Sequence, residues 1–351
     1  MTTLRTLRWN FASGRVASTV PLVALVLQNT GLVILMKHSY RPTALEYSTA
    51  AVVALAEGLK VIACFFISTG TEGLHPTFEA LGNTPAQLNL ALPCALYAIQ
   101  NNLLFFAIYN LPTTLYVVCS QGKIVSSALF SVCLLNARLT RSKVLALFLL
   151  ICGMIFVQLP SGPTRHRENN PDLSKGLAAI SLACGTSGFA GVYLEKMYKS
   201  SLKETSVNTK NMQLSSFSLP ISLLLAIVKD FEAYMSRGFF HGIDAVVVLV
   251  LLLQALGGII VAFVMRHASN LSKCFAVSIS ICLISIISVS QGEEELSARL
   301  IIGVILVNSA TFIFSSSSKV DEAFATPSTR AAEMSSKTQR AESIGPNLTM
   351  T

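Results

Sequence analysis

Charged side chains inside otherwise apolar stretches are the residues of this sequence best suited to chemistry. Residues 115–135, LYVVCSQGKIVSSALFSVCLL, contain one charge, Lys123, near the middle. A cation at membrane depth costs at least about 2.5 kcal/mol by insertion scales, so a partner or ligand must compensate it. On a continuous helix Tyr116, Ser120 and Ser127 share one stripe with Lys123, which could line a polar cavity. The alternative is a structural pair between Lys123 and a buried acid.

Glu57 and Lys60 form a second candidate group, three residues apart in another apolar stretch. This spacing places both side chains on one helical face, where each neutralises the other. An anionic ligand could compete with Glu57 for Lys60. The alternative is an inert pair that only lowers the cost of inserting two charges.

Amides and small residues make up the rest of the candidate set. Tyr97, Gln100, Asn101 and Asn102 offer hydrogen-bond donors and acceptors without net charge, which suits a nucleobase edge or sugar hydroxyls. Amides also join helices in bilayers, and the two explanations stay open. Small residues gather in GTSGFAGVYLEK, residues 185–196, and at 257–258, where close helix contact is the main expectation and room for a flat ring the second.

Several classes of site are missing from the pattern. None of the five histidines falls in the middle of an apolar stretch, and neither an HExxH nor a GxSxG motif occurs. An intramembrane hydrolase or transferase would therefore lack a general base, so we predict no enzyme. The eight cysteines show no CxxC or Cys/His ligand spacing, and we predict neither a metal nor another cofactor. The excess charge at depth is positive, which favours an anionic ligand.

Composition identifies the elements that must position these groups. The chain has 351 residues, of which 52% are hydrophobic and 13% charged, and residues 80–122 contain no Asp, Glu, Lys or Arg. Such runs are too long for the helices of a water-soluble core. We predict an all-α polytopic membrane protein with the lipid bilayer as a partner. The net charge of +8 comes from cations in short loops rather than from one basic stripe, so we predict no nucleic-acid partner.

Ten windows are long and apolar enough to be transmembrane helices, although nine crossings are not excluded because three windows are short or polar. The windows are residues 17–37, 47–69, 88–109, 113–135, 142–159, 175–196, 211–229, 243–265, 271–290 and 299–315.

Lys and Arg counts predict the orientation. With the N-terminus in the cytosol, sixteen lie on the cytosolic side and eight on the other, so both termini are predicted to be cytosolic. The polar loop 160–174 separates five windows from five, and an odd number per half predicts two inverted five-helix repeats. The predicted units are a cytosolic segment 1–16, repeats 17–159 and 175–315, a lumenal loop 160–174 between them, and a disordered cytosolic tail 316–351.

Four segments carry a resemblance to a known family: YAIQNNLLFFAIYNL, LYVVCSQGKIVSSALFSVCLLNARLTRSK, GLAAISLACGTSGFAGVYLEKMYKSS and GGIIVAFVMRHASNLSKCFAVSISI. They resemble the Golgi nucleotide-sugar transporters, in the branch that carries CMP-sialic acid, UDP-galactose and UDP-N-acetylglucosamine. The likeness covers about residues 21–314. It implies a ten-helix drug/metabolite-transporter fold that exchanges a cytosolic nucleotide sugar for a lumenal nucleoside monophosphate. It also implies the Golgi membrane, with the endoplasmic reticulum as the alternative.

The resemblance assigns a substrate site. Lys123 and Lys60 would bind the phosphate that both ligands share, with Glu57 beside Lys60, and Lys273 would lie at the cytosolic entrance. The remaining residues implied to line the cavity are Tyr97, Asn101, Asn102, Tyr116, Ser187, Gly188, Gly191 and Asn211.

The chain departs from the family pattern at NLPTT, at Ser120 and at Ser215, where sugar or base contacts would be. We expect UDP-galactose or UDP-N-acetylglucosamine, with CMP-sialic acid as the alternative substrate. A non-transporting receptor or scaffold is the alternative from a different class. The sequence predicts no oligomeric state.

Overall fold

The computed structural model describes residues 14–39, 47–82, 84–111, 113–158, 172–200, 206–292 and 296–324. Every regular element in these ranges is a helix, which confirms the all-α class. The helices are α1 (Gly14–Ser39), α2 (Thr49–Glu72), α3 (Leu74–Gly82), α4 (Thr84–Asn110), α5 (Thr113–Ser120), α6 (Gly122–Leu135), α7 (Arg141–Gln158), α8 (Leu173–Ser200), α9 (Val207–Arg237), α10 (Ala245–His267), α11 (Asn270–Ser290) and α12 (Ala298–Phe324).

Nine candidate membrane spans occur within the described ranges, so the polytopic class is confirmed. Each of the ten predicted windows coincides with a long helix or, for 113–135, with the consecutive helices α5 and α6. Helix α4 covers the window 88–109 but is not among the nine. Ten crossings therefore stay a prediction. The predicted segment 1–16 and loop 160–174 lie mostly outside the described residues.

The fourth predicted span is interrupted, which the sequence analysis did not anticipate. Helix α5 ends at Ser120 and α6 begins at Gly122. Between them the Gln121 amide donates to Val118 O at 3.2 Å and the Ile124 amide to Gln121 O at 2.9 Å, and both are tight three-residue turns. Gly122 favours the interruption because glycine costs about 1 kcal/mol relative to alanine inside a helix.

Helix α12 extends past its predicted end. The expected disordered tail was to start at residue 316, whereas α12 continues to Phe324. The continuation KVDEAF contains neither glycine nor proline, and the next proline is Pro327, so nothing stops the helix earlier. Residues 325–351 lie outside the described residues. Helix α9 also runs on to Arg237, eight residues beyond its predicted window.

Polar side chains cap several helix starts. Ser48, Ser206, Asp244 and Ser269 accept hydrogen bonds from backbone amides in the first turns of α2, α9, α10 and α11. Asp172 does the same for α8, where it accepts from the Lys175 amide at 3.2 Å and the Ser174 hydroxyl at 2.7 Å. These bonds hold the pKa of the Asp172 carboxyl well below its ordinary value. All these caps lie where polar loops enter the helical bundle.

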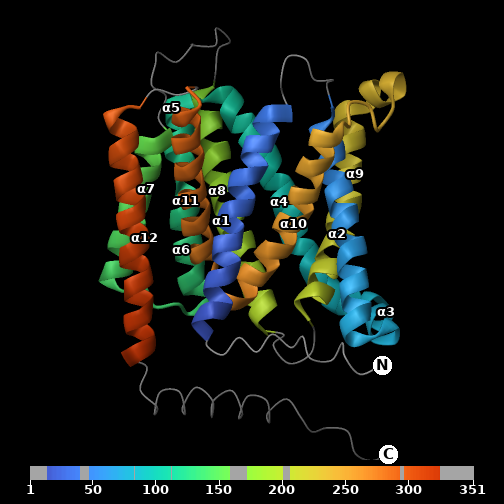
Figure 1. Cartoon of the computed structure of the whole chain (residues 1–351), viewed down its shortest axis with the longest axis horizontal. Coiled ribbons are helices and arrows are strands. Elements are labelled where there is room, and N and C mark those ends of the chain that lie inside the picture. The colour runs from blue at the N-terminus through green and yellow to red at the C-terminus, as the bar shows by residue number, and fades with distance from the viewer. Residues whose placement is uncertain are drawn as a thin grey trace, which may run out of the picture.

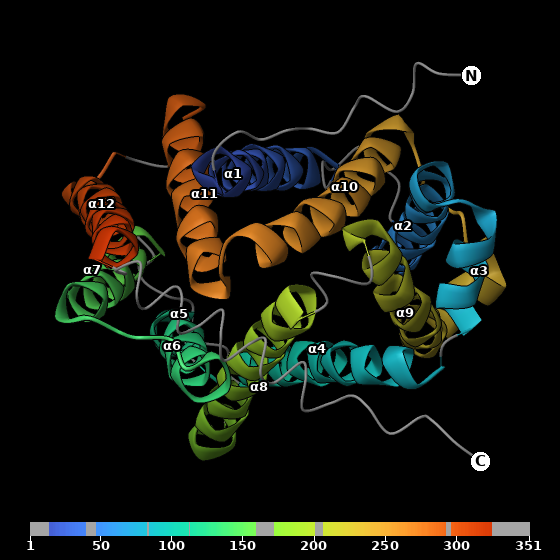
Figure 2. The same cartoon turned by 90° about the horizontal axis from the view of Figure 1, so that it is seen from below.

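The long helices stand side by side and form a closed outline when seen from below (Figures 1 and 2). Helices α7 and α12 form one end of this outline, and α2, α9 and α3 form the other. Helices α1, α10 and α11 run along one side, opposite α4, α8, α5 and α6. The main packed pairs are α7–α12, α2–α9, α4–α8, α6–α8, α1–α10 and α1–α11.

The packed pairs support the predicted inverted repeat. In an inverted repeat each segment of the first half corresponds to one segment of the second half. The correspondence is α1 with α8, α2 with α9, α4 with α10, α6 with α11 and α7 with α12. Exchanging corresponding segments converts the contact α4–α8 into α10–α1, α6–α8 into α11–α1, and α2–α10 into α9–α4, and the structure contains all of them. The pairs α7–α12 and α2–α9 map onto themselves. The repeat itself stays a prediction.

The contact between α7 and α12 is reciprocal at the level of single residues. A Cβ added to Gly153 would lie 2.9 Å from Val307 N and 3.0 Å from Gly303 O. A Cβ added to Gly303 would lie 2.8 Å from Val157 N and 2.9 Å from Gly153 O. Each glycine therefore lets the other helix's backbone approach closely, as small residues do in membrane helix pairs.

Polar residues of α1 join it to its neighbours. Gln28 Nε2 donates to Leu253 O of α10 at 3.0 Å, and Asn29 Nδ2 donates to Ser280 Oγ of α11 at 2.8 Å. Gly257 makes room for Gln28, since an added Cβ there would lie 2.5 Å from Gln28 Nε2. The side-chain amides of Gln28 and Asn29 thus form interhelical hydrogen bonds.

Candidate functional site

The Glu57–Lys60 pair lies near the middle of α2. Lys60 Nζ lies 2.7 Å from Glu57 Oε1, and the Lys60 and Glu57 side chains are only 10% and 16% exposed. The second carboxylate oxygen, Glu57 Oε2, is buried and has no hydrogen-bond partner among the described residues. A buried charge-assisted pair with an unused acceptor can exchange partners when a ligand arrives. Both readings of the pair, ligand site or inert pair, require this contact.

Gly258 of α10 fixes the path of the Lys60 side chain. A Cβ added to Gly258 would lie 2.6 Å from Lys60 Cδ and 2.9 Å from Lys60 Nζ. The lysine stem therefore lies directly on the α10 backbone near the middle of that helix. The glycine pair 257–258 was expected to let helices touch, and here it accommodates polar side chains from α1 and α2.

Asn211 lies behind this pair rather than in an open cavity. It is 1% exposed. Its Nδ2 donates to Cys64 Sγ at 3.6 Å, and its Oδ1 accepts from the Tyr198 hydroxyl at 3.5 Å. The amide thus bridges α2, α8 and α9. Its hydrogen bonds in this conformation are interhelical, and the cavity-lining role stays a prediction.

Lys123 is the second residue of α6, directly after the interruption. It is exposed. The lipid-facing stripe of α6 consists of Val125, Leu129 and Val132, which are 56%, 59% and 39% exposed. Lys123 precedes Val125 by two residues, or about 200° around a helix of 3.6 residues per turn. The ammonium group therefore leaves the helix on the side turned away from lipid, toward the interior of the bundle.

The interruption also changes the electrostatics around Lys123. A helix N-terminus carries roughly half a positive elementary charge, and the first turn of α6 places this end beside the lysine. Helix N-termini within a membrane are used to hold anionic groups. No carboxylate of the described chain forms an ion pair with Lys123, whereas Lys60 is paired with Glu57. The net charge at this depth is positive and suits a phosphate group.

The predicted stripe through Lys123 is split by the interruption. Tyr116 belongs to α5, is partly buried, and packs against the cluster that contains Ile180 and Cys184 of α8. Ser127 belongs to α6, is 4% exposed, and its hydroxyl accepts from Asn270 Nδ2 at 3.1 Å. The interruption at Gln121 divides the four residues between two consecutive helices, and a single cavity-lining stripe stays a prediction. Lys123 itself stays close to α8, within electrostatic range of Cys184.

The glycines of α8 serve close packing. A Cβ on Gly188 would lie 2.6 Å from Ser126 Cβ and 2.7 Å from Ser127 N, so α6 and α8 touch there. A Cβ on Gly191 would lie 2.6 Å from Asn270 Oδ1 of α11. Ser187 beside them is partly exposed. The packing explanation, which was the main expectation, fits both glycines.

Helix α4 connects the Lys60 and Lys123 groups. Its Cys94 lies within electrostatic range of Glu57 and Lys60, and its Leu104 packs in the cluster that contains Tyr116. These two residues are ten positions apart, or about 15 Å along the helix. Tyr97, partly exposed, and Gln100, whose buried Oε1 has no partner in the described part of the chain, lie between them. The side chains of the neighbouring residues 101–102 are outside the described residues.

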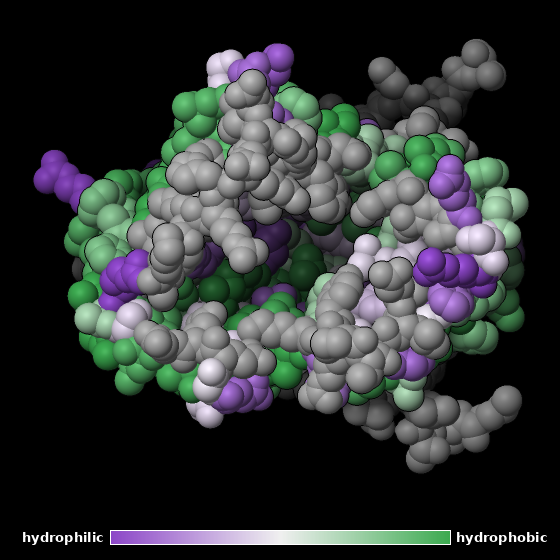
Figure 3. Space-filling model, turned by 90° about the horizontal axis from the view of Figure 1, so that it is seen from above, coloured by the Kyte–Doolittle hydropathy of each residue, from purple (hydrophilic) through white to green (hydrophobic). Residues whose placement is uncertain are grey.

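The upper face of the bundle is hollowed near its middle, and hydrophilic residues lie inside the hollow (Figure 3). Lys273 lies at the opposite end, in the first turn of α11, and is partly exposed. The structure does not bring it together with Lys60 and Lys123. This position agrees with an entrance residue rather than with a central ligand contact.

The fold is shared with a solved protein. One crystal structure superposes with a TM-score of 0.61 at 14% identity, covering 86% of this chain and 96% of the other. A model of the family described as nucleotide-sugar transporter matches residues 15–315. The chain belongs to the nucleotide-sugar transporter family. Members of this family are transporters and not enzymes.

Three relatives show how close the similarity is. The UDP-N-acetylglucosamine/UDP-N-acetylgalactosamine transporter nstp-4 of Caenorhabditis elegans is 38% identical over 84% of this chain and 92% of its own length. The UDP-N-acetylglucosamine transporter of Rattus norvegicus is 39% identical over 83% and 92%. The UDP-galactose transporter of Schizosaccharomyces pombe is 36% identical over 84% and 86%.

Sequence reasoning missed a buried polar group at the lower end of this transporter. Glu195 of α8 is 2% exposed, and its Oε2 accepts from the Asn270 amide at 2.7 Å. Its Oε1 lies 2.6 Å from Lys199 Nζ. The carboxylate therefore caps the N-terminus of α11 from α8, and Asn270 extends the link to α6. The available signal was an acidic residue at the end of an apolar span.

Proposed function

We propose that the chain exchanges a UDP-sugar for a nucleoside monophosphate across the membrane by alternating access. One observation carries the proposal: in the middle of the segment formed by α5 and α6, Lys123 points away from lipid, has no acidic partner in the described chain, and lies beside the positive end of α6. Such a site favours the phosphate that both exchanged ligands contain.

Lys60 would act as a second phosphate-binding cation, which Glu57 neutralises while the site is empty. In the empty site Glu57 neutralises it at 2.7 Å. A bound phosphate can replace Glu57 as the partner of Lys60, and the loss of one ion pair is offset by the gain of another. Both ligands contain phosphate, so either one can replace Glu57 as the partner of Lys60. Binding of either ligand would therefore favour the same change of conformation.

The relatives support the substrate class. Those at 36–39% identity are named as transporters of UDP-N-acetylglucosamine, of UDP-N-acetylgalactosamine or of UDP-galactose. We therefore place UDP-N-acetylglucosamine and UDP-galactose first. CMP-sialic acid is the alternative substrate for the same fold.

Location and orientation are part of the proposal. The family resemblance supports the Golgi membrane, where UDP-sugars are consumed on the lumenal side. The distribution of Lys and Arg supports cytosolic termini. The lower face in Figure 1, where α1 begins and α12 ends, is then cytosolic. The hollow of Figure 3 would open to the lumen.

Exchange in reconstituted vesicles tests the proposal. Vesicles preloaded with UMP should take up labelled UDP-N-acetylglucosamine or UDP-galactose faster than empty ones, with CMP-sialic acid as a further arm. Lys123→Ala should abolish this stimulated uptake. Lys196→Ala is the matched control, because Lys196 is an exposed lysine on α8. Uptake that does not depend on preloading with any pyrimidine nucleotide would refute the proposal, and a non-transporting receptor or scaffold predicts no stimulated uptake by the parent chain itself.

A further inference from the structure

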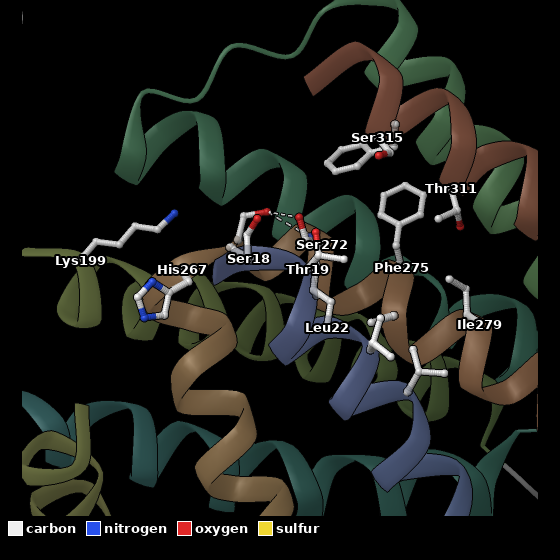
Figure 4. A pocket seen from close by; sticks show the side chains of 16 residues that line it. Ser18, Thr19, Leu22, Lys199, His267, Ser272, Phe275, Ile279, Thr311 and Ser315 are labelled. Atoms are coloured by element: carbon white, nitrogen blue, oxygen red, sulfur yellow. Dashed lines mark hydrogen bonds between the residues drawn. The ribbon is translucent and has the colours of Figure 1, made fainter. Parts of the chain in front are cut away.

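A second cavity lies at the lower end of the bundle, away from Lys60 and Lys123. Its volume is about 710 Å³, and α1, α11 and α12 supply most of its walls (Figure 4). Cavities of this size can hold a small-molecule ligand. Nothing in the proposed exchange uses it.

The lining changes from polar to apolar with depth. At the end of the bundle it includes Ser272, Lys199 and His267 (Figure 4). Deeper in the bundle it includes Val23, Phe275 and Ile279. Ser272 and Ile279 are seven residues apart on α11, or about 10 Å at 1.5 Å per residue. This gradient matches a molecule with a polar head and an apolar chain.

The cavity opens toward the lipid-facing surface. Val23 lines it and is also 52% exposed on α1. On α12 the lining residue Thr311 is followed by Phe312, which is 74% exposed. A nucleotide in this cavity would face the acyl chains of the bilayer. A membrane lipid is therefore the fitting occupant.

The polar end favours a negative headgroup. Lys199 contributes an ammonium whose side chain is 38% exposed. Its contact with Glu195 uses one of the three donors of the ammonium. His267 adds a second nitrogen-bearing side chain, and Ser272 adds a hydroxyl. Among the lining residues that the structure describes, none has an acidic side chain.

We propose that this cavity binds an anionic phospholipid from the leaflet at the lower face, which is cytosolic in the predicted orientation. The headgroup contacts Lys199, His267 and Ser272, and one acyl chain follows α1 and α11 past Val23 and Ile279. Lys199 also holds Glu195, which accepts from the Asn270 amide. The lipid thereby acts on the contact between α8 and α11.

Native mass spectrometry of the purified full chain tests this site with added phosphatidylinositol and phosphatidylcholine. Phosphatidylinositol should bind at one molecule per chain, at least tenfold more tightly than phosphatidylcholine. Lys199→Gln should weaken it about fivefold, since one lysine near a headgroup contributes about that much. Val23→Trp should fill the opening and abolish binding. Lys196→Gln and Val20→Trp are the controls, because both residues are exposed on the same helices but do not line the cavity.

Three results would overturn the inference. They are equal affinity for both lipids, equal binding by Val23→Trp and Val20→Trp, or displacement of the lipid by UMP, which would make the cavity a nucleotide site. Melting temperatures of all variants identify any that fail to fold, and Lys199→Gln alone still decides the headgroup contact.

Discussion

Replacing Gly258 by alanine tests whether the position of Lys60, and not only its charge, sets substrate affinity. The added methyl would lie 2.6 Å from Lys60 Cδ, whereas ordinary carbon contacts are about 3.5–4.0 Å. The lysine stem must therefore move by about 1 Å. Both charges of the pair remain in the variant. Only their placement changes.

The magnitude follows from the contact that this shift removes. Lys60 Nζ lies 2.7 Å from Glu57 Oε1, and a 1 Å displacement takes it out of hydrogen-bond range. A hydrogen bond to a charged group contributes about 1.5–3 kcal/mol. Glu57 lies three residues away on the same helix and can follow the displaced ammonium by changing rotamer, whereas a phosphate fixed by its other contacts cannot, so the loss falls on the loaded state. The Michaelis constant for the nucleotide sugar should therefore rise by about 10- to 100-fold, at about 1.4 kcal/mol per factor of ten.

Counterflow uptake in vesicles measures this effect, with Gly58→Ala as the control. Gly58 is on α2 beside Glu57, and among the described residues a Cβ there meets only Leu219 Cδ1 at 3.8 Å, an ordinary contact. The control should transport like the parent chain. If Gly258→Ala matches Gly58→Ala in Michaelis constant, Lys60 does not position the substrate and this part of the site is wrong. A melting temperature close to that of the parent would show that the variant is folded.

Three further outcomes are expected. Gly188→Val should lower the melting temperature and reduce uptake, because overpacking against Ser126 costs about 1–3 kcal/mol. Gly185→Val should do neither, since no atom of the described part of the chain lies within 4 Å of a Cβ at Gly185. Glu195→Gln should destabilise the protein by about 1.5–3 kcal/mol in chemical denaturation, because charge-assisted hydrogen bonds of a buried carboxylate become neutral ones, and a change below 1 kcal/mol would contradict the buried link to α11. The stabilisation by Asp172 should be complete above its unfolded pKa of about 3.9 and lost only as the pH falls through its lower folded value. The difference in melting temperature between Asp172→Ala and the parent should therefore be constant from about pH 5 to 8, and a difference that changes across this range would refute the cap.

Much of the fold could be predicted because membrane spans are recognised by length and apolar content alone. All ten windows coincide with helical segments, and the isolated polar residues at depth identified α2, α4 and α5–α6 as the elements of interest. The interruption at Gln121–Gly122 was missed because one glycine inside an apolar run is common and gives no clear boundary.

Contacts between distant segments could not be predicted from one sequence. Gly258 contacts Lys60 because α10 and α2 are neighbours with these residues facing each other. Asn270 likewise contacts Glu195 and Ser127 because of how α11, α8 and α6 are placed and rotated. Asn211 shows the same limit. Its residue type suits ligand binding and interhelical bonding equally, and only packing decides which applies.

The reciprocal glycine contact between α7 and α12 has a mechanical consequence. Each glycine lies against the other's backbone, so sliding one helix along the other would drive Val157 and Val307 into opposing main chain. Turning about the contact point keeps both glycines in place. During transport the α7–α12 end of the bundle would act as a pivot with little translation. The opposite end, at α2 and α9, would move through a larger distance. Substitutions near residues 153 and 303 should therefore alter turnover rate more than ligand affinity.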